Sequence, residues 1–284
     1  MTNTKEKINS TQYIEETIHA ISVIKIVYDQ QEKLINSVKI GFKTFFYSKK
    51  WLIYLVLAFM WIPVIIIIED YDLKIEKPDE AFVNAMLDGL FPTIFIFGCL
   101  LLSLPLSADE ISDHSIELYL VRPIKREVYW LSRWIVVNVV VYCVNILIYF
   151  AYYIFVHAFA EQGMFAGIEE NLLVFGKVAI ILLLATLIYS GSFLLVGMIG
   201  NRGLLLSFML AIFELFLIQF FFLNKNPYIP QNNIYEIAND LLPNLVDFDT
   251  PDDLTLQNAW IYVTIFPIVV FFGGAFYLRM REIK

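Results

Sequence analysis

The sequence predicts an all-α integral membrane protein with six transmembrane helices, and its composition and the length of its apolar runs carry this prediction. Of 284 residues, 59% are hydrophobic and 17% are charged, whereas soluble domains are about 45–50% apolar and about 25% charged. A helix needs roughly 20 apolar residues to cross the ~30 Å hydrocarbon core of a bilayer. The runs are continuously apolar rather than alternating, which excludes a β-barrel. A water-soluble enzyme is excluded, and the net charge of −8 excludes a nucleic-acid-binding arm.

Each predicted span is bounded by polar or charged residues. The spans cover residues 51–68, 85–107, 135–156, 172–199, 204–223 and 261–278. Before the first span, apolar residues recur at helical spacing from Ile35 to Phe46, while Lys39 and Lys43 lie on another face. This pattern predicts an interfacial elbow helix at the end of a cytoplasmic amphipathic segment, residues 1–50. Upstream, residues 14–28 are typical of either a further amphipathic helix or a solvated tail.

The distribution of basic residues predicts the orientation, because Lys and Arg are retained on the cytoplasmic side of a membrane. Most of the 20 basic residues lie in segments 1–50, 107–134, 199–203 and 279–284, on one side of the predicted spans. The loops after the first and fifth spans are acidic. Because the number of spans is even, both termini, including the tail 279–284, are expected in the cytoplasm. The protein is expected in the plasma membrane.

The longest predicted cytoplasmic loop, residues 107–133, mixes charges with apolar residues at helical spacing. Ile111, Ile116 and Leu120 interrupt the charged stretch before Pro123. Proline disfavours the helical conformation of the residue before it, so we expect a short helix, a break at Arg122-Pro123 and a second helix leading into the third span. Two such helices would form a surface for docking.

The loop resembles the segment after the second span in permease subunits of type 2 ATP-binding cassette (ABC) exporters of the six-helix class. Glu110 matches the acidic position of that family, residues 115–118 match its helix, and residues 120–123 match the Leu-rich run before the break. Residues 123–126 (Pro-Ile-Lys-Arg) match its Pro-x-x-Arg. His114-Ser115 replaces the common Gly-Thr. The elbow helix and the acidic segment between the last two spans are also similar to this family.

The resemblance implies that segment 107–133 is a coupling segment seated in a groove of a separate ATPase subunit. The residues expected to contact or position that partner are Asp109, Glu110, Asp113, Glu117, Arg122, Pro123 and Arg126. The alternative is that these charges solvate the loop and hold it at the membrane surface. The resemblance also implies a second permease subunit, identical or similar, and ATP with Mg²⁺ bound in the ATPase partner.

The chain is not expected to be an enzyme by itself. A phosphate-binding loop needs Gly-x-x-x-x-Gly-Lys-[Ser/Thr], yet the Gly176-Lys177 pair is followed by Val178 and preceded at the required spacing by Asn171. His19, His114 and His157 are widely separated, and no His-Glu-x-x-His motif occurs. We therefore expect no catalytic residue, no metal site and no directly bound cofactor. ATP hydrolysis is expected in another polypeptide.

Glu214 lies ten residues into the fifth predicted span, near the middle of the bilayer. An ionised carboxylate there costs at least ~2.5 kcal/mol and should face protein or water. Two interpretations stay open: a protonated group hydrogen-bonded between helices, or a residue that lines a translocation path.

The sequence thus predicts a permease subunit that couples ATP hydrolysis by separate ATPases to export of a substrate. A membrane accessory or anchoring protein, not driven by ATP, is the alternative; it would use the cytoplasmic loop for binding alone. Membrane lipids are expected as partners in both cases, and nucleic acid in neither.

Overall fold

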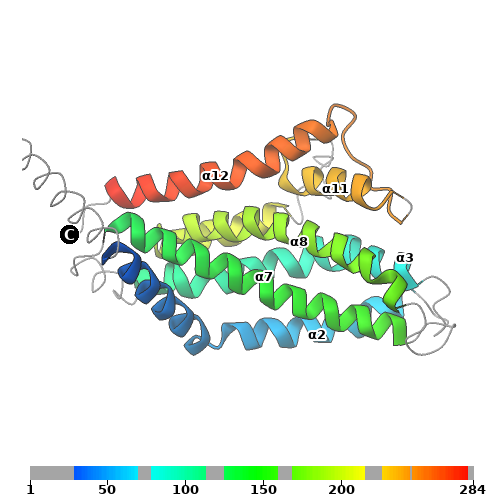
Figure 1. The fold of residues 1–284 in the computed structure, drawn as a ribbon, viewed down its shortest axis with the longest axis horizontal. Coiled ribbons are helices and arrows are strands. Elements are labelled where there is room, and N and C mark those ends of the chain that lie inside the picture. Colours follow the sequence, from blue (N-terminus) through cyan, green and yellow to red (C-terminus); the bar gives the residue numbers. More distant parts are fainter. Residues whose placement is uncertain are drawn as a thin grey trace, which may run out of the picture.

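The computed structural model describes residues 29–69, 78–112, 125–158, 168–214, 226–243 and 245–280, and every regular element within these ranges is helical. Figure 1 shows that α2 (Lys50–Glu69), α7 (Arg126–Ala158), α8 (Ile168–Gly197) and α12 (Leu256–Met280) run lengthwise through a helical bundle. The remaining labelled elements are shorter and pack against these four.

Four helical stretches are long and apolar enough to cross a membrane. They cover Asp79–Ser112, Arg126–Ala158, Leu172–Gly197 and Leu256–Met280. They coincide with the second, third, fourth and sixth predicted spans, so the prediction of an all-helical chain with apolar helices of membrane length is confirmed for these four. The helix Lys50–Glu69 covers the first predicted span, and its part with described side chains, Lys50–Met60, is apolar. In the described part of the fifth span, the apolar helix is shorter, Arg202–Ile212. The count of six and the side on which each terminus lies remain predictions.

A helix covers residues 29–47, within the segment where the sequence predicts the elbow helix. Between this helix and α2, Lys49 has a φ of 54°, the left-handed region that residues with a side chain seldom adopt. This one residue turns the chain, so that the first helix, dark blue in Figure 1, meets α2 at an angle.

The second stretch begins earlier than predicted and is irregular. Helix α3 (Pro78–Asn84) continues into the π-helical η1 (Ala85–Phe95), then α4 (Ile96–Ser103), the 3₁₀ turn η2 (Leu104–Leu106) and α5 (Ala108–Ser112). Pro92 lies inside η1. Proline has no N–H to donate and its ring crowds the preceding turn, so a wider helical turn accommodates it.

The third, fourth and sixth spans also differ from their predicted bounds. Helix α7 begins at Arg126, as expected for the helix predicted to lead into the third span, and so starts before the span's predicted bound at residue 135. Helix α8 begins at Ile168 rather than 172, and α12 runs from Leu256 to Met280 rather than from 261 to 278. These extensions are richer in polar or charged residues than the predicted spans. An apolar-run criterion ends a span where hydropathy falls, whereas the backbone continues as a helix.

Helix α8 occupies the centre of the bundle, where it packs against α4, α7, α9 (Asn201–Ile212), α11 (Pro230–Leu241) and α12. Neighbouring helices are also joined by hydrogen bonds between polar side chains. Tyr54 in α2 donates to Asn145 Oδ1 at 2.5 Å, and Ser190 in α8 donates to Asn138 Oδ1 at 2.8 Å. Such bonds add to van der Waals packing as links between helices in a membrane.

Helix α11 and the chain after it form a folded layer against α12 and α8. The Tyr235 hydroxyl donates to the Leu87 carbonyl at 3.1 Å, and the Tyr235 ring stacks on Phe248 with centroids 4.2 Å apart. The Asn239 side chain makes two hydrogen bonds to the Phe248 backbone, each 2.9 Å. The acidic segment predicted after the fifth span is therefore ordered by packing in its described part.

Candidate functional site

The coupling segment predicted at 107–133 falls partly on described residues. Asp113, Glu117, Arg122 and Pro123 lie outside them. Asp109 and Glu110 lie in α5, and Arg126 is the first residue of α7. The structure therefore describes both ends of the segment, where the chain leaves α5 and where it enters α7.

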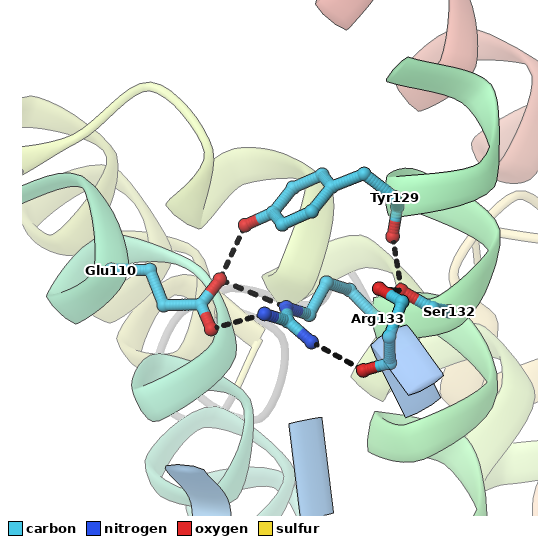
Figure 2. A network of polar contacts seen from close by, with 5 residues as sticks. Glu110, Tyr129, Ser132 and Arg133 are labelled. Carbon is cyan, nitrogen blue, oxygen red and sulfur yellow. Dashed lines mark hydrogen bonds and ion pairs between the residues drawn. The ribbon is translucent and has the colours of Figure 1, made fainter. Parts of the chain in front are cut away.

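Glu110 and Arg133 form a buried ion pair between α5 and α7, shown in Figure 2. Arg133 Nη2 lies 2.8 Å from Glu110 Oε1, and Arg133 Nε donates to Oε2 at 2.9 Å. The side chains are 0% and 2% exposed. The Tyr129 hydroxyl also donates to Oε2, and the Arg133 guanidinium lies over the Tyr129 ring, 4.8 Å from its centroid. The hydrogen bond through Nε and the close ionic contact through Nη2 together fix both the distance and the orientation of the pair.

The same network reaches the helix over residues 29–47. Arg133 Nη1 donates to the Ser37 carbonyl at 3.2 Å, and the Ser37 and Ser132 hydroxyls lie 2.6 Å apart. Ser132 donates to the Tyr129 carbonyl at 2.7 Å. Gly41 allows this close approach, because a Cβ there would lie 2.7 Å from Arg133 Nη1. Three segments distant in sequence thus meet at one guanidinium.

A second ion pair joins α5 to the start of α2. Lys50 Nζ lies 2.5 Å from Asp109 Oδ2, and the two side chains are 30% and 31% exposed. Partly exposed pairs contribute about 0–1 kcal/mol to stability, much less than a buried pair. This contact orients α5 more than it stabilises the fold.

Arg126 connects α7 to the end of α12. Its Nη1 donates to the carbonyls of Leu278 and Arg279, both at 3.1 Å. The last carbonyls of a helix have no partner within the helix, and a cation there also complements the helix dipole. Arg126 therefore caps the C-terminus of α12 and holds it beside the start of α7.

The predicted residues differ in what they face. Glu110 is turned into the protein and paired, whereas Asp109 and Arg126 are partly exposed and contact neighbouring helices. Sequence reasoning missed the role of Arg133 and Tyr129. Their spacing of four residues places them on one face of the helix predicted after Pro123, but the sequence does not show that Glu110 lies opposite that face.

Glu214, the candidate path residue, is 5% exposed and accepts a hydrogen bond from the Tyr189 hydroxyl. Its carboxylate also lies near the backbone of Gln231. Glu214 lies two residues beyond the end of α9, Tyr189 belongs to α8 and Gln231 to the first turn of α11. Its described contacts thus link the residues after α9 to α8, and both interpretations left open by the sequence stay predictions.

Among the residues that the structure describes, no group of three or more His, Cys, Asp or Glu side chains could hold a metal ion. The described cysteines, Cys99 and Cys143, are both free thiols. The site at α5 and α7 is made of ion pairs and hydrogen bonds between helices, an arrangement suited to transmitting a displacement.

Comparison of the chain with protein-family models, with curated proteins and with solved structures finds no match. Its function is therefore inferred from its own residues and their contacts.

Proposed function

We propose that this chain is the permease subunit of an ABC-type exporter, in which separate ATPase subunits bind the segment between α5 and α7. One observation carries the proposal: both ends of this segment are fastened to other helices of the bundle. Glu110 in α5 pairs with Arg133 in α7, Asp109 pairs with Lys50 in α2, and Arg126 caps α12. A loop with a binding role alone has no need of these connections.

The contacts provide a route by which a displacement of residues 113–124 spreads through the bundle. A displacement of α5 reaches α7 through the Glu110–Arg133 ion pair, and it reaches the helix over 29–47 through Ser37. A displacement of the first turn of α7 reaches α12 through Arg126. Closure of the ATPases on ATP would in this way reorient the permease helices and move a substrate out of the membrane or across it.

The proposal includes the rest of the transporter. ATP and Mg²⁺ are bound by the ATPase subunits, and this chain has no catalytic role. A second permease subunit, identical or similar, completes the transmembrane unit. Six spans place both termini in the cytoplasm of a protein embedded in the plasma membrane.

The test is co-purification from the native host of the chain and an ATPase with a Walker motif. We expect the ATPase to accompany the wild-type chain and to be lost from a variant with Asp113→Lys and Glu117→Lys in the loop. The matched control carries Asp252→Lys and Asp253→Lys, an equal charge change at two exposed residues before α12. Glu110 is unsuitable for charge reversal because it is buried and paired.

Two results would contradict the proposal. One is the absence of any Walker-motif ATPase with the wild-type chain, and the other is equal retention of the ATPase by the loop variant and the control. Either result favours the accessory or anchoring protein.

A further inference from the structure

A long groove lies on the face between α7 and α12. It consists of two cavities of about 430 and 420 Å³ that share Leu131, Phe271 and Phe272. The first cavity extends to Glu127 and Arg279 at the helix ends, and the second reaches Val263 deeper in the bundle. The shared lining residues place the two cavities next to each other along α12, and together we call them the groove.

The groove has the dimensions and the walls of a site for an acyl chain. Between Arg279 and Val263 it follows α12 for about 24 Å at 1.5 Å per residue, more than the roughly 15 Å of one leaflet of a ~30 Å hydrocarbon core. Its wall is aromatic, and Phe272 and Phe276 are 65% and 64% exposed. Both flanking helices are long and apolar enough to cross a membrane.

The mouth of the groove carries one charge of each sign. Glu127 and Arg279 line the outer cavity, and both residues are exposed. Within the described ranges, neither side chain has an ion-pair partner or a hydrogen bond. The neighbouring Arg126 donates to the carbonyls at the end of α12. Among the described residues that line this mouth, the charged side chains are those of Glu127 and Arg279.

We infer that the groove between α7 and α12 binds a zwitterionic phospholipid with an amine headgroup, of the phosphatidylethanolamine type. An acyl chain occupies the aromatic groove, the phosphate faces the Arg279 guanidinium, and the ammonium faces the Glu127 carboxylate. The phosphate of a phospholipid with an anionic headgroup can also face Arg279. The rest of that headgroup then lies beside the Glu127 carboxylate without an ammonium to pair with it. Charge at the mouth therefore selects the headgroup, and the apolar wall holds the chain.

The inference rests on the placement of α7 and α12 in a membrane and not on an ATPase partner. Its failure leaves the proposed transport function untouched, and loss of the ATPase leaves the lipid site untouched. Under the proposed orientation, the headgroup belongs to the inner leaflet.

Native mass spectrometry of the full-length chain, purified in detergent and incubated with phosphatidylethanolamine or phosphatidylglycerol, tests the site. The wild-type chain is expected to retain phosphatidylethanolamine in preference to phosphatidylglycerol. Glu127→Gln should reduce this preference by about two- to fivefold, the range expected for one exposed ion pair. Arg279→Gln should weaken the binding of both lipids by a similar factor, whereas Arg202→Gln, at an exposed arginine outside the groove, should change neither.

A third variant tests the apolar part of the groove. Ala275→Trp fills the outer cavity and should abolish lipid retention, while Val269→Trp, at an exposed position of α12 that does not line the groove, should not. Equal retention of the two lipids by the wild-type chain overturns the headgroup assignment. If neither Ala275→Trp nor Arg279→Gln changes lipid retention, the site is overturned. It is also overturned if these variants change the oligomer mass instead of the lipid content, because the groove then belongs to a contact with a second protein chain.

Discussion

Arg133 and Glu110 lie 23 residues apart in the sequence and face each other through two charge-assisted contacts of 2.8 and 2.9 Å, both side chains buried. Desolvation of two charges offsets much of their mutual attraction, so such a pair contributes little net stability compared with apolar side chains of similar volume. Removing one partner is different, because the other charge is then buried without compensation. The pair therefore fixes the relative position of α5 and α7.

This difference predicts a specific pattern of stability. Glu110→Leu and Arg133→Met, each alone, should lower the free energy of unfolding by about 3–5 kcal/mol, and the double variant that combines them should recover most of that loss. Thermal unfolding in detergent measures the series. The control is Lys50→Met, which breaks a partly exposed pair and should cost at most about 1 kcal/mol. Additive losses in the double variant would refute the pairing.

Gly274 in α12 provides a second prediction. A Cβ at this residue would overlap the Trp130 ring, which is fully buried and whose Nε1 donates to the Phe271 carbonyl at 2.8 Å. Gly274→Ala should destabilise the contact between α7 and α12 by about 1–3 kcal/mol, the usual cost of overpacking. The adjacent Gly273→Ala is the control, because its Cβ would lie 3.8 Å from Leu195 Cδ2. Equal melting temperatures of the two variants would contradict the close approach.

The sequence identified the apolar centres of α7, α8 and α12, because continuous hydropathy is a local property that long helices in a membrane require. It placed the start of the third span at residue 135, within a helix that it expected to begin after Pro123. Residues 126–133 contain Arg126, Glu127 and Arg133, and charges in a run normally end a predicted span. The structure compensates Arg133 with Glu110 from another helix, a contact that no local pattern contains.

Helix α11 was missed for a related reason. Its buried residues include Gln231, Asn232 and Asn233, which are typical of loops by composition. Asn233 Nδ2 donates to the carbonyls of Pro227 and Ile229 at 2.7 and 2.9 Å, and Gln231 Nε2 donates to the Tyr235 hydroxyl at 2.7 Å. These side chains can be buried because they form hydrogen bonds within the helix and with the turn before it. Hydropathy alone does not reveal such hydrogen bonds.

A third prediction concerns Tyr189 and Glu214. Tyr189→Phe removes the hydroxyl that donates to the buried carboxylate, and a buried acceptor that loses a donor costs about 1–3 kcal/mol. Thermal unfolding measures the loss. Tyr277→Phe is the control, since the Tyr277 hydroxyl makes no hydrogen bond among the described residues, and its effect should stay within about 0.5 kcal/mol. A Tyr189 variant as stable as this control would remove the link between α8 and Glu214.

Glu214→Gln separates the two interpretations of this residue. The amide oxygen can still accept the Tyr189 hydroxyl, so the variant is expected to assemble with a loss of stability of at most about 1 kcal/mol. If Glu214 is a link between helices alone, transport by the variant in membrane vesicles proceeds at the wild-type rate, and this is the result we expect from its described contacts. Altered transport with intact stability would place Glu214 on the translocation path.

Arg126 tests the connection between the coupling segment and α12. Arg126→Ala removes both bonds to the carbonyls of Leu278 and Arg279. The free energy needed to open the last turn of α12 should therefore fall by about 0.5–2 kcal/mol, the contribution of a cationic cap at a helix C-terminus. Hydrogen exchange should rise in residues 276–280 and not at the centre of α12. Lys125→Ala, at the exposed residue before Arg126, is the matched control.

Because the proposed route from the ATPase to α12 runs through this cap, ATP hydrolysis in the Arg126 variant should continue while transport falls. Loss of both together would mean that Arg126 serves ATPase binding instead.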